Sequence, residues 1–172
     1  MTTRELLQKA RSARTALLAA DTALKNNALL AMAQALLDHT DAILAANALD
    51  MDEARGKTTQ VMLDRLALDP GRIRGMSEGV HQVAALPDPV GRVLSTAERP
   101  NGLTIRKVSV PMGVIAIIYE SRPNVTSDAA ALALKAGSAC VLRAARRPSA
   151  PPMPLWTPCG TDCPELACPP SW

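Results

Sequence analysis

The chain has 172 residues, which is enough for one domain with a hydrophobic core. Its formal net charge of +3 is small, and it contains no Phe, one Tyr and two Trp, a composition that speaks against nucleic-acid binding. No run reaches the roughly 18 apolar residues that span a bilayer, and the N-terminus lacks the apolar segment of a secretory signal. A cytoplasmic protein without nucleic-acid or membrane partners is predicted.

Leu and Ala recur at spacings of three and four in the first half of the chain, which is typical of packed amphipathic helices. The segment Thr2–Glu5 (TTRE) fits a capping box that begins a helix running to about Ala20. Thr40 is expected to cap the third helix and Gly56 to end it. Residues 2–85 are thus predicted to be mostly helical, with the later helices over Ala23–His39, Thr40–Gly56, Thr59–Leu66 and Pro70–Ala85, the last capped by Asp69.

The hydrophobic period changes after the last of these helices. The stretch LTIRKVSV alternates apolar and polar residues, as a half-buried strand does. Asn101 and Gly102 both tolerate positive φ and form a hairpin turn signal. A β-hairpin is therefore predicted over Arg92–Val110.

A strand, a helix and a second strand follow the hairpin. The continuous apolar run GVIAIIYE predicts a strand buried on both faces, and Pro123 with Asn124 ends it. A helix is expected over about Thr126–Ala136, ended by Gly137, before the apolar strand SACVLR. This order predicts a parallel, right-handed βαβ unit, which needs further strands to close its hydrophobic layers.

Residues 144–172 supply no such elements. They hold eight of the fourteen Pro and three of the four Cys, and they show neither a helical nor a strand period. The spacing of Cys159, Cys163 and Cys168 is a poor match to zinc sites and lacks a fourth ligand, so no metal is predicted. Cys140, inside a strand, is interpreted as a small buried apolar residue.

The run VPMGVIAIIYESRPNVTSDAAALALKAGSACVLR resembles the start of the cofactor domain of the γ-glutamyl phosphate reductases, a proline-biosynthesis branch of the aldehyde dehydrogenase superfamily. The signature YESRPNVT (Tyr119–Thr126) is specific to that branch, and AILAANALDMDEAR, MLDRLALDPGRIRGM and DPVGRV are similar to it as well. The resemblance implies an oxidoreductase that reduces L-glutamate 5-phosphate with NADPH, by way of a cysteine thioester, to glutamate 5-semialdehyde and phosphate. It also implies a homo-oligomer.

The resemblance assigns roles to five residues. Asn124 is expected to donate its amide to the developing oxyanion, and Arg122 to pair with a carboxylate or phosphate of the substrate. Tyr119 and Ser121 are expected to line the nicotinamide pocket. Arg143, at the end of the second strand, is expected to face the 2′-phosphate of NADP. A turn Asn and a solvated surface Arg are the alternatives for Asn124 and Arg122.

The resemblance covers residues 1–143 and implies a truncated α/β fold. The N-terminal part of the NADP-binding domain, with an aldehyde-dehydrogenase-like parallel sheet, would consist of residues 1–91 and 111–143. Residues 92–110 would form an oligomerisation hairpin. The family's nucleophilic Cys belongs to a catalytic domain that is not matched here, so the chain is expected to be inactive alone.

A frameshift explains where the resemblance stops. Family members commonly continue LR with Gly-Gly-Lys-Glu-Ala, encoded for example by GGC GGC AAG GAG GCC. Loss of one G from the first of these codons gives Ala-Ala-Arg-Arg-Pro, the sequence that begins at Ala144. Residues 144–172 are therefore interpreted as a non-homologous, poorly ordered tail. The alternative function is a non-catalytic helical interaction module whose Pro-rich tail recruits a partner.

Overall fold

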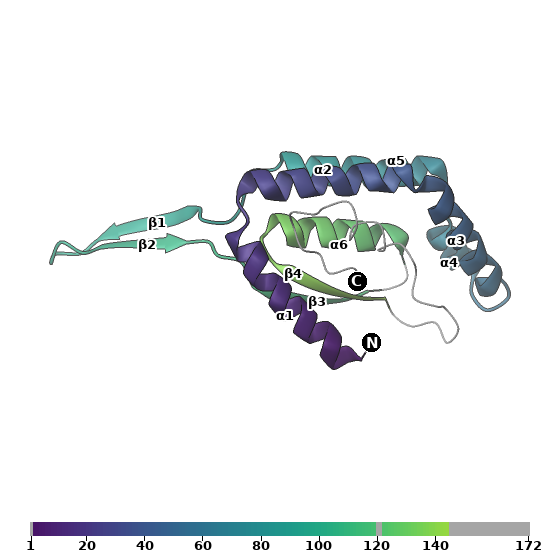
Figure 1. The fold of residues 1–172 in the computed structure, drawn as a ribbon, viewed down its shortest axis with the longest axis horizontal. Coiled ribbons are helices and arrows are strands. Elements are labelled where there is room, and N and C mark those ends of the chain that lie inside the picture. Colours follow the sequence, from purple (N-terminus) through teal and green to yellow (C-terminus); the bar gives the residue numbers. More distant parts are fainter. Residues whose placement is uncertain (1, 120–121, 145–172) are drawn as a thin grey trace.

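A computed structural model describes residues 2–119 and 122–144 (Figure 1). It confirms the mixed helix and strand fold class, with helices first, then a hairpin, then a βαβ unit. The elements in chain order are α1 (Thr3–Ala19), α2 (Thr22–Asp38), α3 (Thr40–Ala54), α4 (Gln60–Leu66), α5 (Pro70–Ala85), β1 (Val93–Glu98), β2 (Thr104–Val108), β3 (Val114–Tyr119), α6 (Pro123–Lys135) and β4 (Ala139–Ala144).

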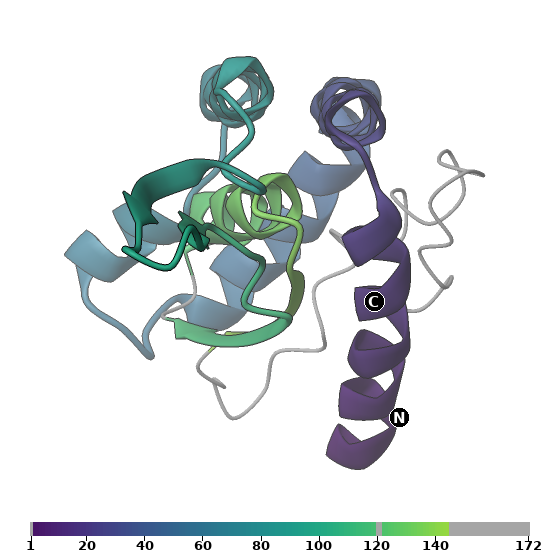
Figure 2. The same ribbon diagram turned by 90° about the vertical axis from the view of Figure 1, so that its left-hand side faces the viewer.

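The helices form layers over one face of the β3–β4 pair. Figure 2 shows α2 and α5 side by side, with α6 beneath them and the strands beyond α6, while α1 lies at the side and contacts β4. Because the chain has no Phe, aliphatic side chains fill the space between the three helices. This core consists of Leu29, Met32, Ala33, Val80, Ala84 and Ala131.

The predicted helix boundaries are largely confirmed. Thr2 and Glu5 form both hydrogen bonds of the capping box, and α5 begins after Asp69, whose carboxylate accepts from the Arg72 backbone N–H at 2.8 Å. The prediction for Thr40 was wrong. It is the first helical residue of α3, and its hydroxyl donates backward to the Leu37 carbonyl at 2.7 Å, because α2 and α3 follow each other too closely for a separate cap.

The hairpin of β1 and β2 projects away from the helical layers (Figure 1). Its strands pair antiparallel from Val93 with Val108 to Glu98 with Thr104, and every residue in them is exposed. The turn differs from the expected two-residue turn, since only Gly102, at φ +83°, adopts positive φ. Asn101 instead accepts a hydrogen bond from the Leu103 N–H through its side chain at 3.2 Å.

The βαβ unit is confirmed, with β3 and β4 parallel from Val114 opposite Ala139 to Tyr119 opposite Ala144. Two details differ from expectation. The helix α6 begins at Pro123, because Pro is favoured at the first helical position, so Asn124 is helical and does not lie in a loop. β3 is not buried on both faces, because the described residues add no further strand: Ile118 is 77% exposed.

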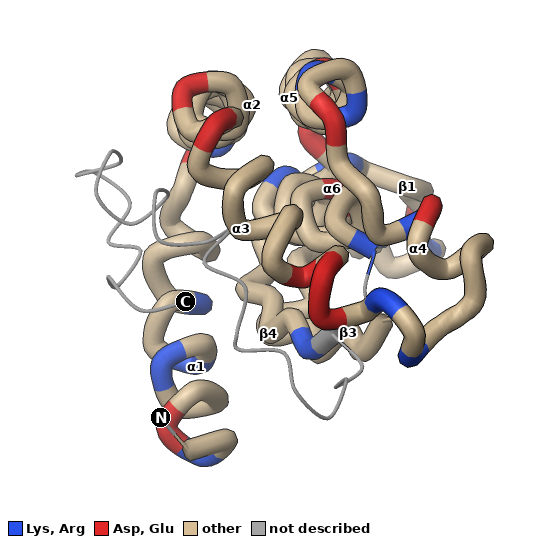
Figure 3. Tube along the Cα trace, turned by 90° about the vertical axis from the view of Figure 1, so that its right-hand side faces the viewer, with Lys and Arg blue, Asp and Glu red and all other residues tan. Residues whose placement is uncertain are grey.

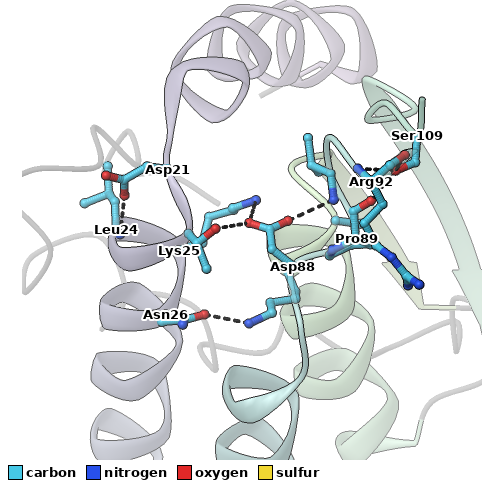
Figure 4. A network of polar contacts seen from close by, with 12 residues as sticks. Asp21, Leu24, Lys25, Asn26, Asp88, Pro89, Arg92 and Ser109 are labelled. Carbon is cyan, nitrogen blue, oxygen red and sulfur yellow. Dashed lines mark hydrogen bonds and ion pairs between the residues drawn. The ribbon is translucent and has the colours of Figure 1, made fainter. Parts of the chain in front are cut away.

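A buried polar network joins the helices at the base of the hairpin (Figure 4). The Asp88 carboxylate forms an ion pair with Lys25 at 2.5 Å and accepts from the Thr22 hydroxyl at 2.7 Å. Lys135, at the end of α6, donates to the Asn26 side chain at 2.6 Å and to the Ala84 carbonyl at 2.8 Å. These contacts fix the ends of α5 and α6 against the start of α2.

Two sequence predictions concern residues that lie partly or wholly outside the ranges that the structure describes. The predicted tail begins at Ala144, but Ala144 is the last residue of β4, where it pairs with Tyr119. The rest of the tail, from residue 145 onward, and Ser121 lie outside the described residues, so the expectations for them stay predictions. No single helix in the described ranges is long and apolar enough to cross a membrane; only α2 and α3 taken together, as a pair bent by 66°, reach the required length and composition.

Candidate functional site

A cavity of about 440 Å³ lies at the start of α6. Figure 3 shows the backbone of α4, α5 and α6, which supply its lining residues. Its walls come from the end of α4, the first half of α5 and the first turns of α6. The carboxyl ends of parallel strands are where α/β sheets bind ligands, and β3 and β4 both end on this side. The volume lies within the range of about 300–1,000 Å³ that is typical of small-molecule sites.

Two of the expected site residues line this cavity. Arg122 is the N-cap residue of α6, and Asn124 follows Pro123 in the first turn. The Asn124 carbonyl accepts a hydrogen bond from the Ser127 hydroxyl at 2.8 Å, which fixes the first turn of the helix. The start of α6 therefore brings a guanidinium and a carboxamide to the same cavity.

The other expected residues do not line it. The Tyr119 hydroxyl lies 2.5 Å from the hydroxyl of Thr126 and ties the end of β3 to α6. Arg143 is exposed on β4, beside Ile118 of β3. Ser121 lies outside the described residues. Tyr119 and Arg143 are therefore not among the residues that line the cavity at the start of α6.

Sequence reasoning gave no role to four further charged residues that line the cavity: Asp64, Arg65, Arg72 and Asp128. Arg72 stabilises the wall, because its Nη1 donates to the carbonyls of Asp64 at 2.6 Å and Ala67 at 2.5 Å. The buried Asn47 supports the same wall, since its side chain donates to the Leu66 carbonyl and accepts from the Leu68 N–H. The connection from α4 to α5 is therefore held in place.

Arg65 and Asp128 differ from Arg72 in having no ion pair with any other residue in the described ranges. Partial burial raises the pKa of Asp128 above the usual value for a carboxyl group. Arg65 lies in the motif MLDRLALDPGRIRGM. The resemblance of that motif to the reductases was the sequence signal that could have indicated this wall of the cavity. No pattern in the sequence indicates that Asp128 faces it.

Helices packed on a parallel βαβ unit, with a cavity at the start of its helix α6, define an α/β protein. No family model matches the chain. Over 122 residues it is 63% identical to γ-glutamyl phosphate reductases of the Streptococcus pneumoniae strains Hungary19A-6 and D39, a match that covers 71% of this chain and 29% of the relative. The chain is thus a homologue of γ-glutamyl phosphate reductases over one segment of their length.

Two solved structures show the same relationship. The γ-glutamyl phosphate reductase of Thermotoga maritima matches with a TM-score of 0.76 and 43% identity, over 80% of this chain and 33% of that one. The enzyme of Saccharomyces cerevisiae matches with a TM-score of 0.75 and 32% identity, over 85% of this chain and 38% of that one. The fold is therefore that of an N-terminal part of this reductase.

Proposed function

We propose that this chain is the N-terminal part of an NADPH-dependent reductase that converts L-glutamate 5-phosphate to glutamate 5-semialdehyde and phosphate in proline biosynthesis. Its homologues carry the name of this enzyme, although the chain spans only about three tenths of the length of the curated relatives. The observation that carries the proposal is the start of α6, which presents Asn124 and Arg122 to one cavity at the sheet edge.

These two residues suit a reaction at an acyl phosphate. A side-chain amide donates hydrogen bonds, and Asn124 is exposed in the first turn of α6, where the positive end of the helix dipole also favours negative charge. Asn124 would therefore stabilise the oxyanion that forms at the substrate carbonyl, and losing one such donor costs about 10²–10³-fold in rate. Arg122 would hold an acidic group of the substrate through its paired N–H donors.

Arg143 fits the 2′-phosphate of NADPH. Its side chain is exposed near the carboxyl end of β4, where dinucleotides bind in α/β folds, and it forms no ion pair with another described residue. Tyr119 and Ser121 would border the nicotinamide, and of these the structure describes Tyr119. NADPH would supply the hydride for the reduction.

We propose that the 172-residue chain has no turnover of its own. The reaction needs a thiolate beside the substrate carbonyl, and Cys140, the one cysteine in the described ranges, lies within β4 opposite Ile115, away from the cavity lining. As part of the same proposal, the cofactor domain would include residues 1–91 and 111–143. Residues 144–172 would be a frameshifted tail.

Nicotinamide absorbance tests these points directly. With glutamate 5-semialdehyde, phosphate and NADP, the 172-residue chain should give no reduction of NADP, whereas a gene restored in frame at Ala144 should encode an active enzyme. Turnover by the short chain that disappears on changing Cys159, Cys163 or Cys168 would contradict the proposal. An inactive restored protein with an intact fold would contradict the assigned substrate.

We also propose that the hairpin of residues 92–110 contacts another subunit. All its strand residues are exposed, and Val93 and Leu94 are 53% and 56% exposed although both are large and apolar. Exposed apolar surface of this kind marks interaction sites. Light scattering should show a dimer or larger assembly that Leu94→Glu weakens; a strict monomer would contradict the assignment.

A further inference from the structure

Of the charged residues at the cavity to which the proposed reaction gives no role, Asp64 and Arg72 form an ion pair with each other, which leaves Arg65 and Asp128. They carry opposite charges, they come from different helices, and both line the same cavity. Neither forms an ion pair with another residue in the described ranges. Charged side chains that face a cavity without a partner are candidates for binding a ligand.

Hydrogen bonds at both ends of α4 fix the backbone position of Arg65. It lies in the last turn of α4, and that helix begins at the N-cap Thr59, whose hydroxyl accepts from the Met62 N–H. The helix end is held by Asn47, which donates to the neighbouring Leu66 carbonyl at 3.0 Å. A guanidinium on a backbone fixed in this way can bind a carboxylate through two parallel N–H donors.

Asp128 lines the same cavity from α6, where it lies in the second turn. It lies close to α5, since a Cβ placed on Gly79 would be 3.8 Å from its Oδ1. The residue is exposed to solvent, partial burial raises the pKa of its carboxyl group, and no basic residue in the described ranges forms an ion pair with it. A cationic group of a ligand would supply the missing partner.

We propose that Arg65 and Asp128 bind the α-carboxylate and the α-ammonium group of an L-amino-acid substrate, so that this cavity is the subsite for its head group. The inference rests on the proposed function, whose substrate is an amino acid with an activated side-chain carboxyl. Arg122 and Asn124 border the same cavity and would face the activated side-chain carboxyl of the substrate. Arg72 is excluded from the role because it is bound to the carbonyls of Asp64 and Ala67.

L-Glutamate is a suitable probe, because it carries the head group and requires neither cofactor nor nucleophile. We expect it to shift the backbone amide resonances of residues near 65 and 128 in the isotope-labelled 172-residue chain. Glutarate lacks the ammonium group and γ-aminobutyrate lacks the α-carboxylate, so both should bind about tenfold or more weakly than L-glutamate. Because this comparison uses the unaltered chain, it does not depend on the folding of any variant.

Single substitutions then test whether each of the two charged residues contributes to binding. Arg65→Gln and Asp128→Asn should each raise the Kd for L-glutamate by about tenfold or more, since each removes a charge-assisted hydrogen bond. Arg74→Gln and Glu78→Gln are matched controls, because both residues are exposed on α5 and neither lines the cavity. They should leave the Kd unchanged.

A cavity-filling variant offers an independent check. Gly75 lines the cavity, and a Cβ placed there meets no atom within 4 Å, so Gly75→Leu should fold and yet block binding. Circular dichroism would confirm that the helices are retained.

Three results would overturn the inference: glutarate or inorganic phosphate binding as tightly as L-glutamate, an unchanged Kd in both charge variants, or no saturable shift near the cavity. Failure of the proposed function looks different. Selective L-glutamate binding that depends on both charges, together with an inactive restored-frame protein, would support the subsite and reject the reductase.

Discussion

Replacing Asp88 by Asn removes the negative charge that faces the buried ammonium of Lys25 (Figure 4). The two groups are 2.5 Å apart, and the side chains of Lys25 and Asp88 are only 3% and 14% exposed. Asp88 also accepts from the Thr22 hydroxyl and from the Val90 N–H, so it links α2 to the segment that leads into the hairpin. The substitution preserves the size of the side chain and isolates the loss of charge.

The expected loss is a large part of the stability of a small domain. Removing one partner of a buried ion pair leaves the other charge uncompensated and costs about 3–5 kcal/mol, against a total of about 5–15 kcal/mol for typical domains. An exposed pair contributes about 0–1 kcal/mol, and Asp52 with Arg55 is such a pair, since these side chains are 67% and 72% exposed. Asp52→Asn is therefore the matched control.

The same carboxylate makes stability depend on pH. Burial alone would raise the pKa of Asp88, but hydrogen bonds from Lys25, Thr22 and the Val90 N–H outweigh it and lower the pKa from 3.8 to about 2. A carboxyl whose pKa is lower in the folded state stabilises the fold above its unfolded pKa and loses this effect as pH falls toward its folded pKa. About 2 kcal/mol should be lost between roughly pH 5 and pH 2.

Urea unfolding followed by circular dichroism at 222 nm (a helix signal) measures both effects. Asp88→Asn should lower the free energy of unfolding by about 3–5 kcal/mol at neutral pH and flatten the acid dependence. The double variant Lys25→Met/Asp88→Asn should recover much of the loss, because it removes the stranded charge. A loss in Asp88→Asn no greater than in Asp52→Asn, or an unchanged acid profile, would refute the reasoning.

Three further substitutions have defined outcomes in the same unfolding assay. Asn47→Ala should cost about 1–3 kcal/mol, because it leaves the Leu66 carbonyl and the Leu68 N–H without their buried partner; a neutral result would contradict that. Gly137→Ala should cost about 1–3 kcal/mol, since Gly137 has φ +65° and a Cβ there lies 3.1 Å from Pro111; unchanged stability would argue against this turn. Leu29→Ala should cost about 2–5 kcal/mol, as Leu29 is fully buried between α2, α5 and α6, and a loss below 1 kcal/mol would place it outside the core.

The sequence by itself determined the elements that depend on near neighbours. Asp69 and Pro70 begin α5 where they were predicted to, and Gly137, at φ +65°, follows the end of α6 as expected. Such signals work because a cap or a positive-φ glycine acts on backbone groups within a few residues. The change from helical to alternating period likewise located the hairpin and the βαβ unit before Ala144.

Only the tertiary structure decided which charges are buried and which meet at the cavity. Lys25 and Lys135 follow the ordinary pattern of solvated helix residues, yet packing of α2, α5 and α6 leaves them 2% and 3% exposed and paired. Arg65 and Asp128 lie far apart in the sequence, yet the packing of the helices places both in the lining of one cavity. Contacts between elements depend on how whole faces pack together, and the local pattern around a single charged residue does not record them.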